Sequence, residues 1–589
     1  MNNHEKIARR LSTLRDLLDE SRLDGIIVPH ADEYQNENLP ACAERLAWIT
    51  GFTGSAGCAI ILRDKAALFV DGRYTLQAEL ETDSALFERF HLIDYPPHRW
   101  IAETLKPDTR LGFDPWLHTE TEVRALKHAC AETRSILVPC NSNPVDAVWN
   151  DRPPEPAAPI VPHPERFSGE SGADKRRRIA DRLDADALIV TAADSLAWLL
   201  NIRGGDVDYT PLALARSILY RDGSAELFVN PAKVNPDLLS YLSDGVTVRP
   251  ASDFGNTLIT LGGRSVRVDP VQTPFWVIDR LRAADANVMT GSDPCQLAKA
   301  CKNTVELDGM RAAHLRDGVA LCRFLAWLDK AEDIDEITAA RHLFDLRSED
   351  PLFRGNSFAT ISGSGPNAAI IHYHVTEQSN RSLLPGELYL IDSGAQYLDG
   401  TTDVTRTVPV AAHKTPPAAE ERYSFTLVLR GHIALSRVIF PEGATGSQLD
   451  VLARRPLWTE GLDYDHGTGH GVGCYLGVHE GPQRISKHPN TVALQPGMIV
   501  SNEPGFYKPG AYGIRIENLL AVVPNSQRGM LMFEPLTLAP VDRRLIEPGL
   551  MEVSERAWFN RYHARVYETV GPLVDEKTRK WLEKATKPI

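Results

Sequence analysis

Four carboxylates and one histidine in the last third of the chain constrain its fold more than any other feature. They are Asp392, Asp403, His470, Glu503 and Glu517. Carboxylate and imidazole side chains suit manganese, iron, cobalt or zinc, and four clustered carboxylates without cations would repel one another and take up protons. Two divalent ions would nearly neutralise them. The sequence therefore predicts a fold that brings five distant residues around a pair of metal ions.

The two aspartates are predicted to lie on one β-hairpin. Residues 387–392 place every second side chain on one face of a strand that ends at Asp392. Asp399-Gly400 is a strong hairpin-turn signal, and the β-branched segment after it carries Asp403. A two-residue loop at this dipeptide would pair Asp392 with a residue four positions beyond Asp403, roughly 13 Å away and too far for one metal cluster. We therefore expect a wider loop or a β-bulge.

A second hairpin is predicted to carry the two glutamates. Residues 498–503 end at Glu503, a Gly-rich connection follows, and residues 513–517 end at Glu517. In the last strand, alternation places Arg515 on the same face as Glu517. We assign Arg515 to orienting the metal-binding carboxylates, with an ordinary surface ion pair as the alternative.

Histidines occur in Gly-rich or apolar segments close to this metal set. His466 and His470 lie in a Gly-rich run, His479 follows it, and His372 and His374 follow an apolar run upstream. Glycine lets the backbone approach a ligand closely. A Gly-rich run can also cradle phosphate, but no Gly-Lys-Ser/Thr follows here, which disfavours a nucleotide site. A lone histidine is more often structural than catalytic, whereas clustering around a metal set favours a catalytic role.

Together these motifs resemble the Xaa-Pro aminopeptidase (aminopeptidase P) family in its long, three-domain form. Order and spacing agree with the family over residues 390–397, 399–407, 466–473, 478–482, 502–507 and 513–519. The similarity continues upstream at 370–373, 71–74 and 51–57, so it spans nearly the whole chain. Every metal ligand of the family pattern is present.

The resemblance implies a pita-bread catalytic domain with a dinuclear metal centre. By this resemblance the metal ligands are Asp392, Asp403, His470, Glu503 and Glu517, with Asp403 and Glu517 as the bridging pair. We expect two divalent ions per subunit. Manganese is the expected metal, with zinc, cobalt or iron as alternatives.

The reaction implied by the resemblance is removal of the N-terminal residue from peptides with proline in the second position. The bond before proline is a tertiary amide without an N–H, so the site must be shaped for the ring. We expect a hydroxide that bridges the metals to attack this bond, with Glu503 as general base and then general acid. His479 would hydrogen-bond the oxyanion or the substrate carbonyl. His372 and His466 match the remaining active-site histidines and would position the peptide.

Repeated motifs predict two similar domains in front of the catalytic domain. Residues 23–70 and 183–229 contain the same succession of short motifs, offset by roughly 150 to 160 positions. Each copy has the pattern of an α/β unit with a mixed sheet. The predicted fold class is therefore α/β (α+β), with a C-terminal pita-bread domain preceded by two similar α/β domains.

The predicted domain boundaries follow from the repeat and from proline-rich segments. The domains are an N-terminal creatinase-like domain over 1–152, its duplicate over 153–298, and the catalytic domain over 299–589 with an extension from about Val541 that packs on the core. Proline-rich residues 152–164 are either a stiff linker or a strap docked on one domain. Asn303 and Glu306 form a capping-box pattern that predicts a long helix after the second boundary.

Composition and charge set the expected cellular setting. The net charge of −14 and pI near 5.7 argue against nucleic acid as a partner, because phosphate binding needs a basic face. The N-terminus lacks the apolar core of a signal peptide, and no apolar run approaches the length of a membrane span. The eight cysteines include no CxxC pair, as is typical of reduced thiols. We expect a cytoplasmic protein with no nucleic-acid or membrane partner.

Family members of this length form homodimers, and the resemblance implies the same here. Trp458 matches a position that the family uses at its subunit contact. The alternative is a tryptophan buried within its own domain.

Three other functions stay open. A prolidase would share the fold and metals but act on Xaa-Pro dipeptides, and the duplicated front and long tail disfavour it. A creatinase-like metal-free hydrolase would lack the ligand set present here. A catalytically silent pita-bread binding module would have lost metal ligands, and none is lost.

Overall fold

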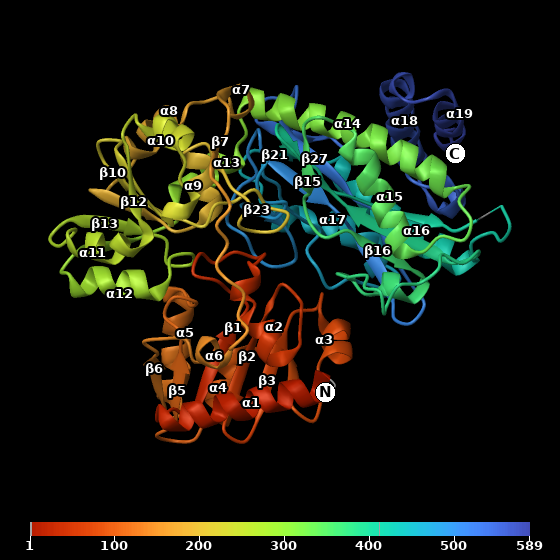
Figure 1. The fold of residues 1–589 in the computed structure, drawn as a ribbon. Helices are drawn as coiled ribbons and strands as arrows, with labels where there is room; N and C mark the ends of the chain where they lie inside the picture. The colour runs from red at the N-terminus through yellow and green to blue at the C-terminus, as the bar shows by residue number, and fades with distance from the viewer. Residues whose placement is uncertain (1–2, 412) are drawn as a thin grey trace. The chain divides into compact units, whose positions relative to one another are not determined.

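The computed structural model describes residues 3–411 and 413–589. The chain forms two compact units (Figure 1). Unit 1 contains the residues up to Glu165 and Glu170–Cys295, and unit 2 contains Arg166–Gly169 and Gln296–Ile589. All residues predicted to bind metal lie in unit 2.

Unit 1 contains two six-stranded mixed sheets with the same topology. The first has the order β4-β3-β2-β1-β5-β6 and the second β12-β11-β10-β8-β13-β14. In each, the central strand, β1 or β8, pairs antiparallel with one neighbour and parallel with the other. The predicted α/β class with mixed sheets is confirmed.

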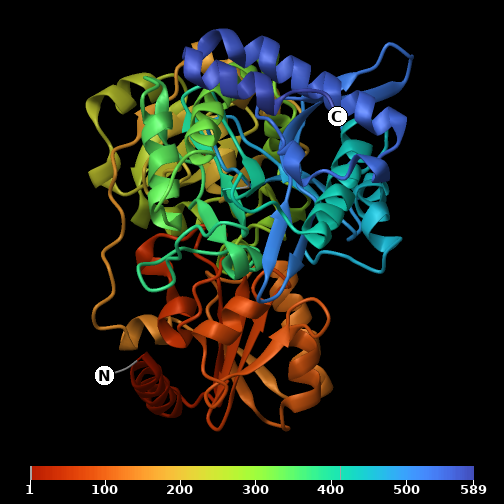
Figure 2. The ribbon, with the colours of Figure 1, turned by 90° about the vertical axis from the view of Figure 1, so that its right-hand side faces the viewer.

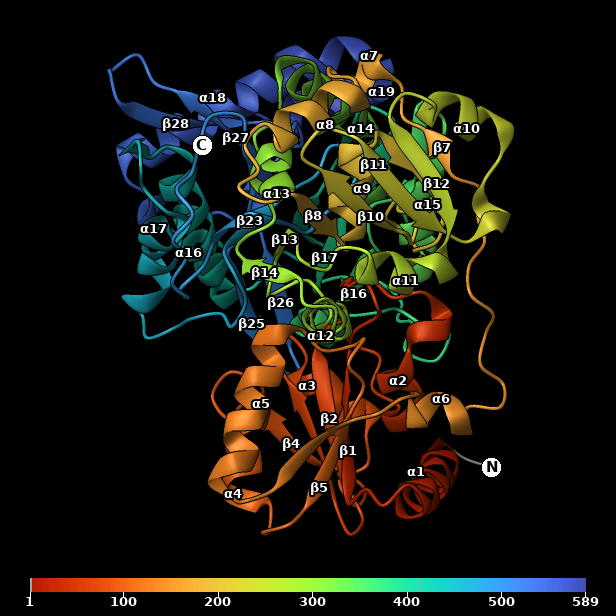
Figure 3. The same ribbon diagram turned by 90° about the vertical axis from the view of Figure 1, so that its left-hand side faces the viewer.

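The strands of the first sheet are β1 Gly25–Pro29, β2 Gly57–Leu62, β3 Ala66–Val70, β4 Glu88–His91, β5 Arg110–Phe113 and β6 Ile136–Pro139. Its helices are α1 Asn3–Glu20, α2 Arg45–Thr50, α3 Thr75–Glu81, α4 Pro97–Thr104, α5 Glu120–Glu132 and α6 Pro144–Val148. Figure 3 shows α1 and α4 on different sides of this sheet. Ile26 packs with the helix α1 residues, and Ile27 packs with Trp100 of α4. Both faces of the sheet are therefore buried, which explains why β1 is a continuous apolar run.

The strands of the second sheet are β8 Ala187–Val190, β10 Arg216–Tyr220, β11 Ala225–Val229, β12 Val246–Pro250, β13 Ser265–Val268 and β14 Asn287–Thr290. Its helices are α8 Gly172–Ala180, α9 Ala193–Leu199, α10 Pro236–Leu242, α11 Phe254–Ile259 and α12 Phe275–Ala283. The proline-rich stretch before it is mostly irregular. Its end docks, because β7 Val161–Pro162 pairs with β9 Ile202–Arg203 and Ile160 is fully buried. That end is a docked strap rather than a free linker.

Unit 2 surrounds its strands with helices. The helices are α7 Glu165–Ser168, α13 Pro294–Ala300, α14 Thr304–Leu328, α15 Glu336–Ser348, α16 Ala419–Ser436, α17 Gly446–Trp458, α18 Val553–Val570 and α19 Glu576–Ala585. The capping box predicted for α14 is confirmed: the Asn303 side chain accepts from the N–H of Glu306, whose carboxylate accepts from the N–H of Asn303. In Figure 2 the C-terminal helices, in dark blue, lie across the outside of the strands. None of the described helices has the length and hydropathy of a bilayer-spanning segment.

The strands of unit 2 form four sheets: β15-β18-β19, β16-β17-β20, β21-β28-β27-β24-β22-β23 and β25-β26. Their bounds are β15 Phe353–Asn356, β16 Ile361–Ser364, β17 Leu388–Ser393, β18 Ala395–Tyr397, β19 Gly400–Thr401, β20 Val404–Pro409, β21 Ile439–Pro441, β22 Gly469–Gly471, β23 Glu480–Ile485, β24 Ile499–Asn502, β25 Gly505–Lys508, β26 Tyr512–Arg515, β27 Asn518–Pro524 and β28 Met530–Pro535.

Arg406 on β20 ties the C-terminal extension to the central strands. Its guanidinium is buried and donates to the carbonyl oxygens of Glu517, Ala539 and Pro540 and to the Tyr562 hydroxyl, at 2.6–3.2 Å. Five donors in a fixed fork suit such a cluster of acceptors. One side chain thus joins β20, the start of β27 and helix α18.

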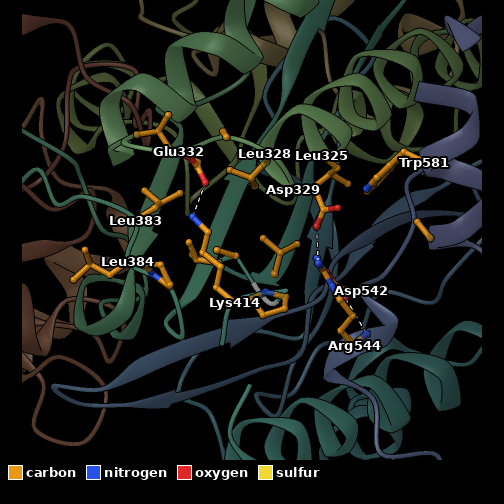
Figure 4. Close-up of a pocket in the computed structure, with 18 of the residues that line it drawn as sticks. Leu325, Leu328, Asp329, Glu332, Leu383, Leu384, Lys414, Asp542, Arg544 and Trp581 are labelled. Carbon is orange, nitrogen blue, oxygen red and sulfur yellow. Dashed lines mark hydrogen bonds and ion pairs between the residues drawn. The ribbon is translucent and has the colours of Figure 1, made fainter. Parts of the chain in front are cut away.

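Two ion pairs lie at the C-terminal end of α14, and one of them holds the C-terminal extension. Arg544 pairs with Asp329, and Lys414 pairs with Glu332. Figure 4 shows both pairs at the rim of a cavity of about 520 Å³, which Trp581 of α19 also lines. Because these pairs are partly exposed, each contributes little to stability compared with Arg406.

Replacing Arg406 with methionine is expected to lower the free energy of unfolding by about 3–5 kcal/mol, because several buried acceptors lose their donor. Thermal and denaturant unfolding measure the change. Arg437→Met is the matched control: Arg437 also contacts the extension, through Ser554, but is exposed, so the expected loss is less than about 0.5 kcal/mol. Equal losses in the two variants would contradict the anchoring role of Arg406.

Candidate metal centre

The register of the first hairpin places Asp392 and Asp403 side by side. Asp392 on β17 pairs with Thr405 on β20, and Tyr397 pairs with Gly400 around a two-residue turn. The expected wider loop or bulge is wrong, because the turn begins one residue earlier than predicted. Since moving a turn by one residue moves every cross-strand partner by two, Asp403 becomes a diagonal neighbour of Asp392, within about 7–8 Å on the same face.

The second hairpin is confirmed, and it places the two glutamates opposite each other. Asn502 pairs with Asn518 between β24 and β27, and Gly505 pairs with Arg515 between β25 and β26. The second pair continues the register of the first. Glu503 and Glu517 therefore lie opposite each other in the gap between the β24–β27 and β25–β26 pairings. Unpaired strand positions of this kind can direct side chains toward a common centre.

Three of the predicted ligands converge closely. Asp403, His470 and Glu517 each offer one ligand atom, and these atoms lie within 4.8 Å of one another. His470 Nε2 is 3.4 Å from Asp403 Oδ2 and 3.5 Å from Glu503 Oε1. The glycine before His470 is required here, because a Cβ on Gly469 would lie 2.0 Å from the carbonyl oxygen of Ser501.

Arg515 connects Asp392 with the rest of the site. It donates from Nη2 to Asp392 Oδ2 at 2.7 Å, from Nη1 to the Tyr507 hydroxyl at 2.6 Å and from Nε to Thr405 Oγ1 at 3.2 Å. The side chain is 2% exposed. The alternative interpretation of Arg515 as a surface ion pair is therefore wrong.

The electrostatics of the site fit divalent cations. Burial, with the charges of Asp403 and Glu503, raises the pKa of Asp392 to about 6 despite Arg515. Burial and the other carboxylates also raise the pKa of Glu517 well above its usual range. Burial acts to lower the pKa of His470, but Asp403 and Glu503 raise it to about 9. Asp392 Oδ1 is buried without a hydrogen-bond partner, as expected of an atom that faces a cation.

Two of the predicted histidines lie beside this cluster. His466 hydrogen-bonds the Tyr507 hydroxyl through Nε2 at 2.9 Å, and its Nδ1 is 3.9 Å from Glu503 Oε2. Because Arg515 donates to the Tyr507 oxygen, the hydroxyl proton is available to His466 Nε2. The His479 ring lies 4.3 Å from the His470 ring, centroid to centroid, at an interplanar angle of 76°.

His372 lies in a turn that Glu336 organises. The turn follows the short helix η4 Gly365–Ala369, and His372 is half-buried whereas His374 is exposed. The buried Glu336 carboxylate accepts hydrogen bonds from Ser364 N, Asn367 Nδ2, Tyr373 OH and Arg381 N. Glu336 was not predicted from the sequence, since the only signal that it gives there is that of an acidic residue at the start of a helix.

Comparison with known families places the whole chain among metallopeptidases and their relatives. Residues 308–524 match Metallopeptidase family M24, and residues 529–589 match the C-terminal region of peptidase M24. Residues 10–147 and 151–306 each match a Creatinase/Prolidase N-terminal domain.

Similar proteins align over nearly their full length. A protein of Coprinopsis cinerea named Probable Xaa-Pro aminopeptidase P is 40% identical, with 99% of this chain and 98% of that protein covered. Aminopeptidase P2 of Arabidopsis thaliana is 41% identical, with 99% and 89% covered. The crystal structure of X-prolyl aminopeptidase from Caenorhabditis elegans, described as a cytosolic enzyme with a di-nuclear active site, has a TM-score of 0.95 at 33% identity and covers 100% of both chains.

Metal binding is expected to stabilise the protein more at pH 7.5 than at pH 5.0. The pKa of Asp392 is raised to about 6 in the metal-free fold. Protonated Asp392 therefore contributes to the free energy of unfolding fully below the usual carboxyl pKa, and this contribution is lost as pH rises through about 6. Cations replace the proton and restore that contribution at neutral pH. Below pH 6, each proton that a cation must displace lowers the metal affinity by about tenfold per pH unit.

Thermal unfolding with EDTA or with added Mn²⁺, Zn²⁺ or Co²⁺ at the two pH values measures this difference. Asp392→Asn should abolish the metal-induced shift at pH 7.5. A shift of the same size at both pH values would contradict the proposed competition between protons and cations.

Proposed function

Because the chain belongs to metallopeptidase family M24, we propose that it is a metal-dependent aminopeptidase that removes the N-terminal residue from peptides with proline in the second position. The observation that carries this function is the convergence of Asp403, His470 and Glu517 in a chain that aligns end to end with proteins named Xaa-Pro aminopeptidase P. The predicted fold class, a pita-bread catalytic domain behind two α/β domains, is confirmed.

Two divalent ions complete the site. The residues that would hold them are Asp392, Asp403, His470, Glu503 and Glu517, with Asp403 and Glu517 shared between the ions. When bound, such ions lower the pKa of water enough to supply hydroxide near neutral pH. Manganese remains the metal that we propose, with zinc, cobalt or iron as alternatives.

Glu503 is the proposed proton carrier. It follows β24, where the Ser501 hydroxyl donates to its Oε1 at 3.2 Å, and it faces Glu517 across the hairpin. Its carboxylate would take the proton from the nucleophile and return it to the departing proline nitrogen. Without a proton this nitrogen would have to leave as an amide anion, which is a poor leaving group, so the return step lets the bond break.

The three histidines would bind and orient the peptide. His479 is proposed to hydrogen-bond the substrate carbonyl and the oxyanion that develops from it. His466 and His372 would position the peptide on either side of the scissile bond. The His466–Tyr507–Arg515 chain supports this role, because it orients the His466 ring through groups that also hold Asp392.

We also propose a homodimer with Trp458 at its contact. Trp458 ends α17 and is 46% exposed, so the alternative of a buried tryptophan is wrong. Val451, two helical turns earlier on the same side, is 43% exposed. An apolar pair on one exposed helix face suits a subunit contact. Cytosolic localisation is proposed from the eight free cysteines.

Cleavage of a peptide series would test the function. The metal-loaded protein should release the first residue from Xaa-Pro-Xaa-Xaa peptides and leave the matched Xaa-Ala-Xaa-Xaa peptides intact, as followed by mass spectrometry. Activity confined to Xaa-Pro dipeptides would instead identify a prolidase. Absence of cleavage in every peptide would support a silent binding module.

Glu503→Gln tests the proton-transfer role of Glu503. It keeps the size and one ligand oxygen of the side chain but removes the base, so turnover should fall by at least about 100-fold. Metal content by mass spectrometry verifies that the variant is loaded. Near-normal turnover of the loaded variant would remove Glu503 from the proposed role.

Trp458→Glu should dissociate the dimer, because a charge would be buried at the contact. Sedimentation velocity measures the change, and Val553→Glu, at another exposed apolar residue, is the control that should leave the dimer intact. A dimer unchanged by Trp458→Glu would reject the interface assignment.

A further inference from the structure

Two lysines and a glutamate without a role in the mechanism above form a buried ion-pair cluster. Lys299 lies on α13, Lys302 follows that helix, and Glu480 opens β23. Lys299 Nζ is 2.7 Å from Glu480 Oε1, and Lys302 Nζ is 3.5 Å from Glu480 Oε2. The three side chains are 2%, 0% and 1% exposed. Both lysines therefore form ion pairs with the same carboxylate, away from water.

Such a cluster fixes geometry more than it stabilises the fold. Removing charges from water is unfavourable, and their mutual attraction offsets the penalty only while the ion-pair distances are kept. A shift of Glu480 would lengthen two ion pairs that water cannot replace. The position of Glu480 is therefore held from two directions.

The Gly-rich loop packs closely against Glu480. Gly471 is its cross-strand partner, and a Cβ on Gly471 would lie 2.3 Å from the Glu480 carbonyl oxygen. A Cβ on Gly473 would lie 2.7 Å from Glu480 Oε1. The backbone that carries metal-site residue His470 thus packs directly on the residue that the lysines hold.

Glu480 directly follows His479, whose ring contacts the His470 ring. Two adjacent residues share a planar peptide unit, so a fixed Glu480 leaves only a few torsions to place the His479 imidazole. The same constraint acts whether or not a substrate is present. His479 would otherwise lie on a loop with little regular structure of its own.

We propose that Lys299 and Lys302 are positioning residues for His479: by holding Glu480, they keep the imidazole beside His470 and in place for the substrate carbonyl. This inference rests on the proposed function, which gives His479 its catalytic role. The position of the His479 ring beside His470 does not depend on that function. Both lysines lie shortly after Gln296, where the main segment of unit 2 begins. The start of this segment therefore supports the active site.

Lys299→Met tests the proposal, because it removes the 2.7 Å ion pair while Glu480 keeps Lys302 as a partner. The kcat for an Xaa-Pro-Xaa-Xaa peptide should fall by about 10- to 100-fold with little change in KM, since a misplaced catalytic group costs mainly kcat. Lys299→Arg should recover most of the loss. Lys302→Met, which leaves the 2.7 Å pair intact, should show the same effect at smaller size.

A double-mutant cycle separates positioning from stability. In a His479→Ala background, Lys299→Met should not lower kcat further, because the group that it positions is absent. Lys233→Met is the matched control: Lys233 forms a 2.6 Å buried ion pair with Asp206 in unit 1, so its loss should lower the thermal midpoint without changing kcat. Additive losses in the cycle would overturn the proposal.

A crystal structure of Lys299→Met gives a result that does not depend on activity. The proposal predicts that the His479 ring moves or becomes disordered relative to His470, and rings that keep their 4.3 Å separation would overturn it. If the wild-type protein cleaves no Xaa-Pro peptide, the proposed function fails, and the structural comparison still decides the positioning role.

Discussion

Repulsion among four clustered carboxylates, three of them buried, is the constraint on which the catalytic unit depends. Asp392, Asp403, Glu503 and Glu517 come together only because two hairpins hold them in register, and no single strand could do so. Burial, together with the neighbouring carboxylates, raises the pKa of both Asp392 and Glu517, so the negative charges of the site disfavour one another where the fold holds them. Arg515 and His470 supply part of the compensation, and cations would supply the rest.

Buried charges next to the site hold the segments that carry it. Arg406 binds the carbonyl of Glu517, Glu336 gathers the turn around His372, and Glu480 joins the His479 segment to two lysines. Arg406 bonds a site residue directly, Glu480 follows one in the sequence, and Glu336 bonds Tyr373, the neighbour of His372. The fold thus places its most costly interactions where a small displacement would matter most for chemistry.

The strands that carry the site and the α/β class of the front domains could be predicted because they depend on local patterns, whereas the pita-bread fold was predicted from the family resemblance. Strand alternation, the Gly-rich connections and the Asn303 cap are encoded within a few residues of one another, and the hairpin of Glu503 and Glu517 followed from them. The first hairpin was predicted with the wrong register, because the turn includes Leu398, which is not a typical turn residue, and only pairing within the sheet selects it. Glu336 and Lys299 could not be recognised, since the partners named for them lie 28 and more positions away and a single charged residue has no pattern.

Arg406 has a consequence for biosynthesis. Its acceptors include the backbone of residues 539 and 540 and the hydroxyl of Tyr562, all more than 130 positions further along the chain. Until those residues have left the ribosome, the nascent catalytic unit contains a guanidinium without these acceptors. The packing around β20 can therefore be completed only after Tyr562 has been synthesised.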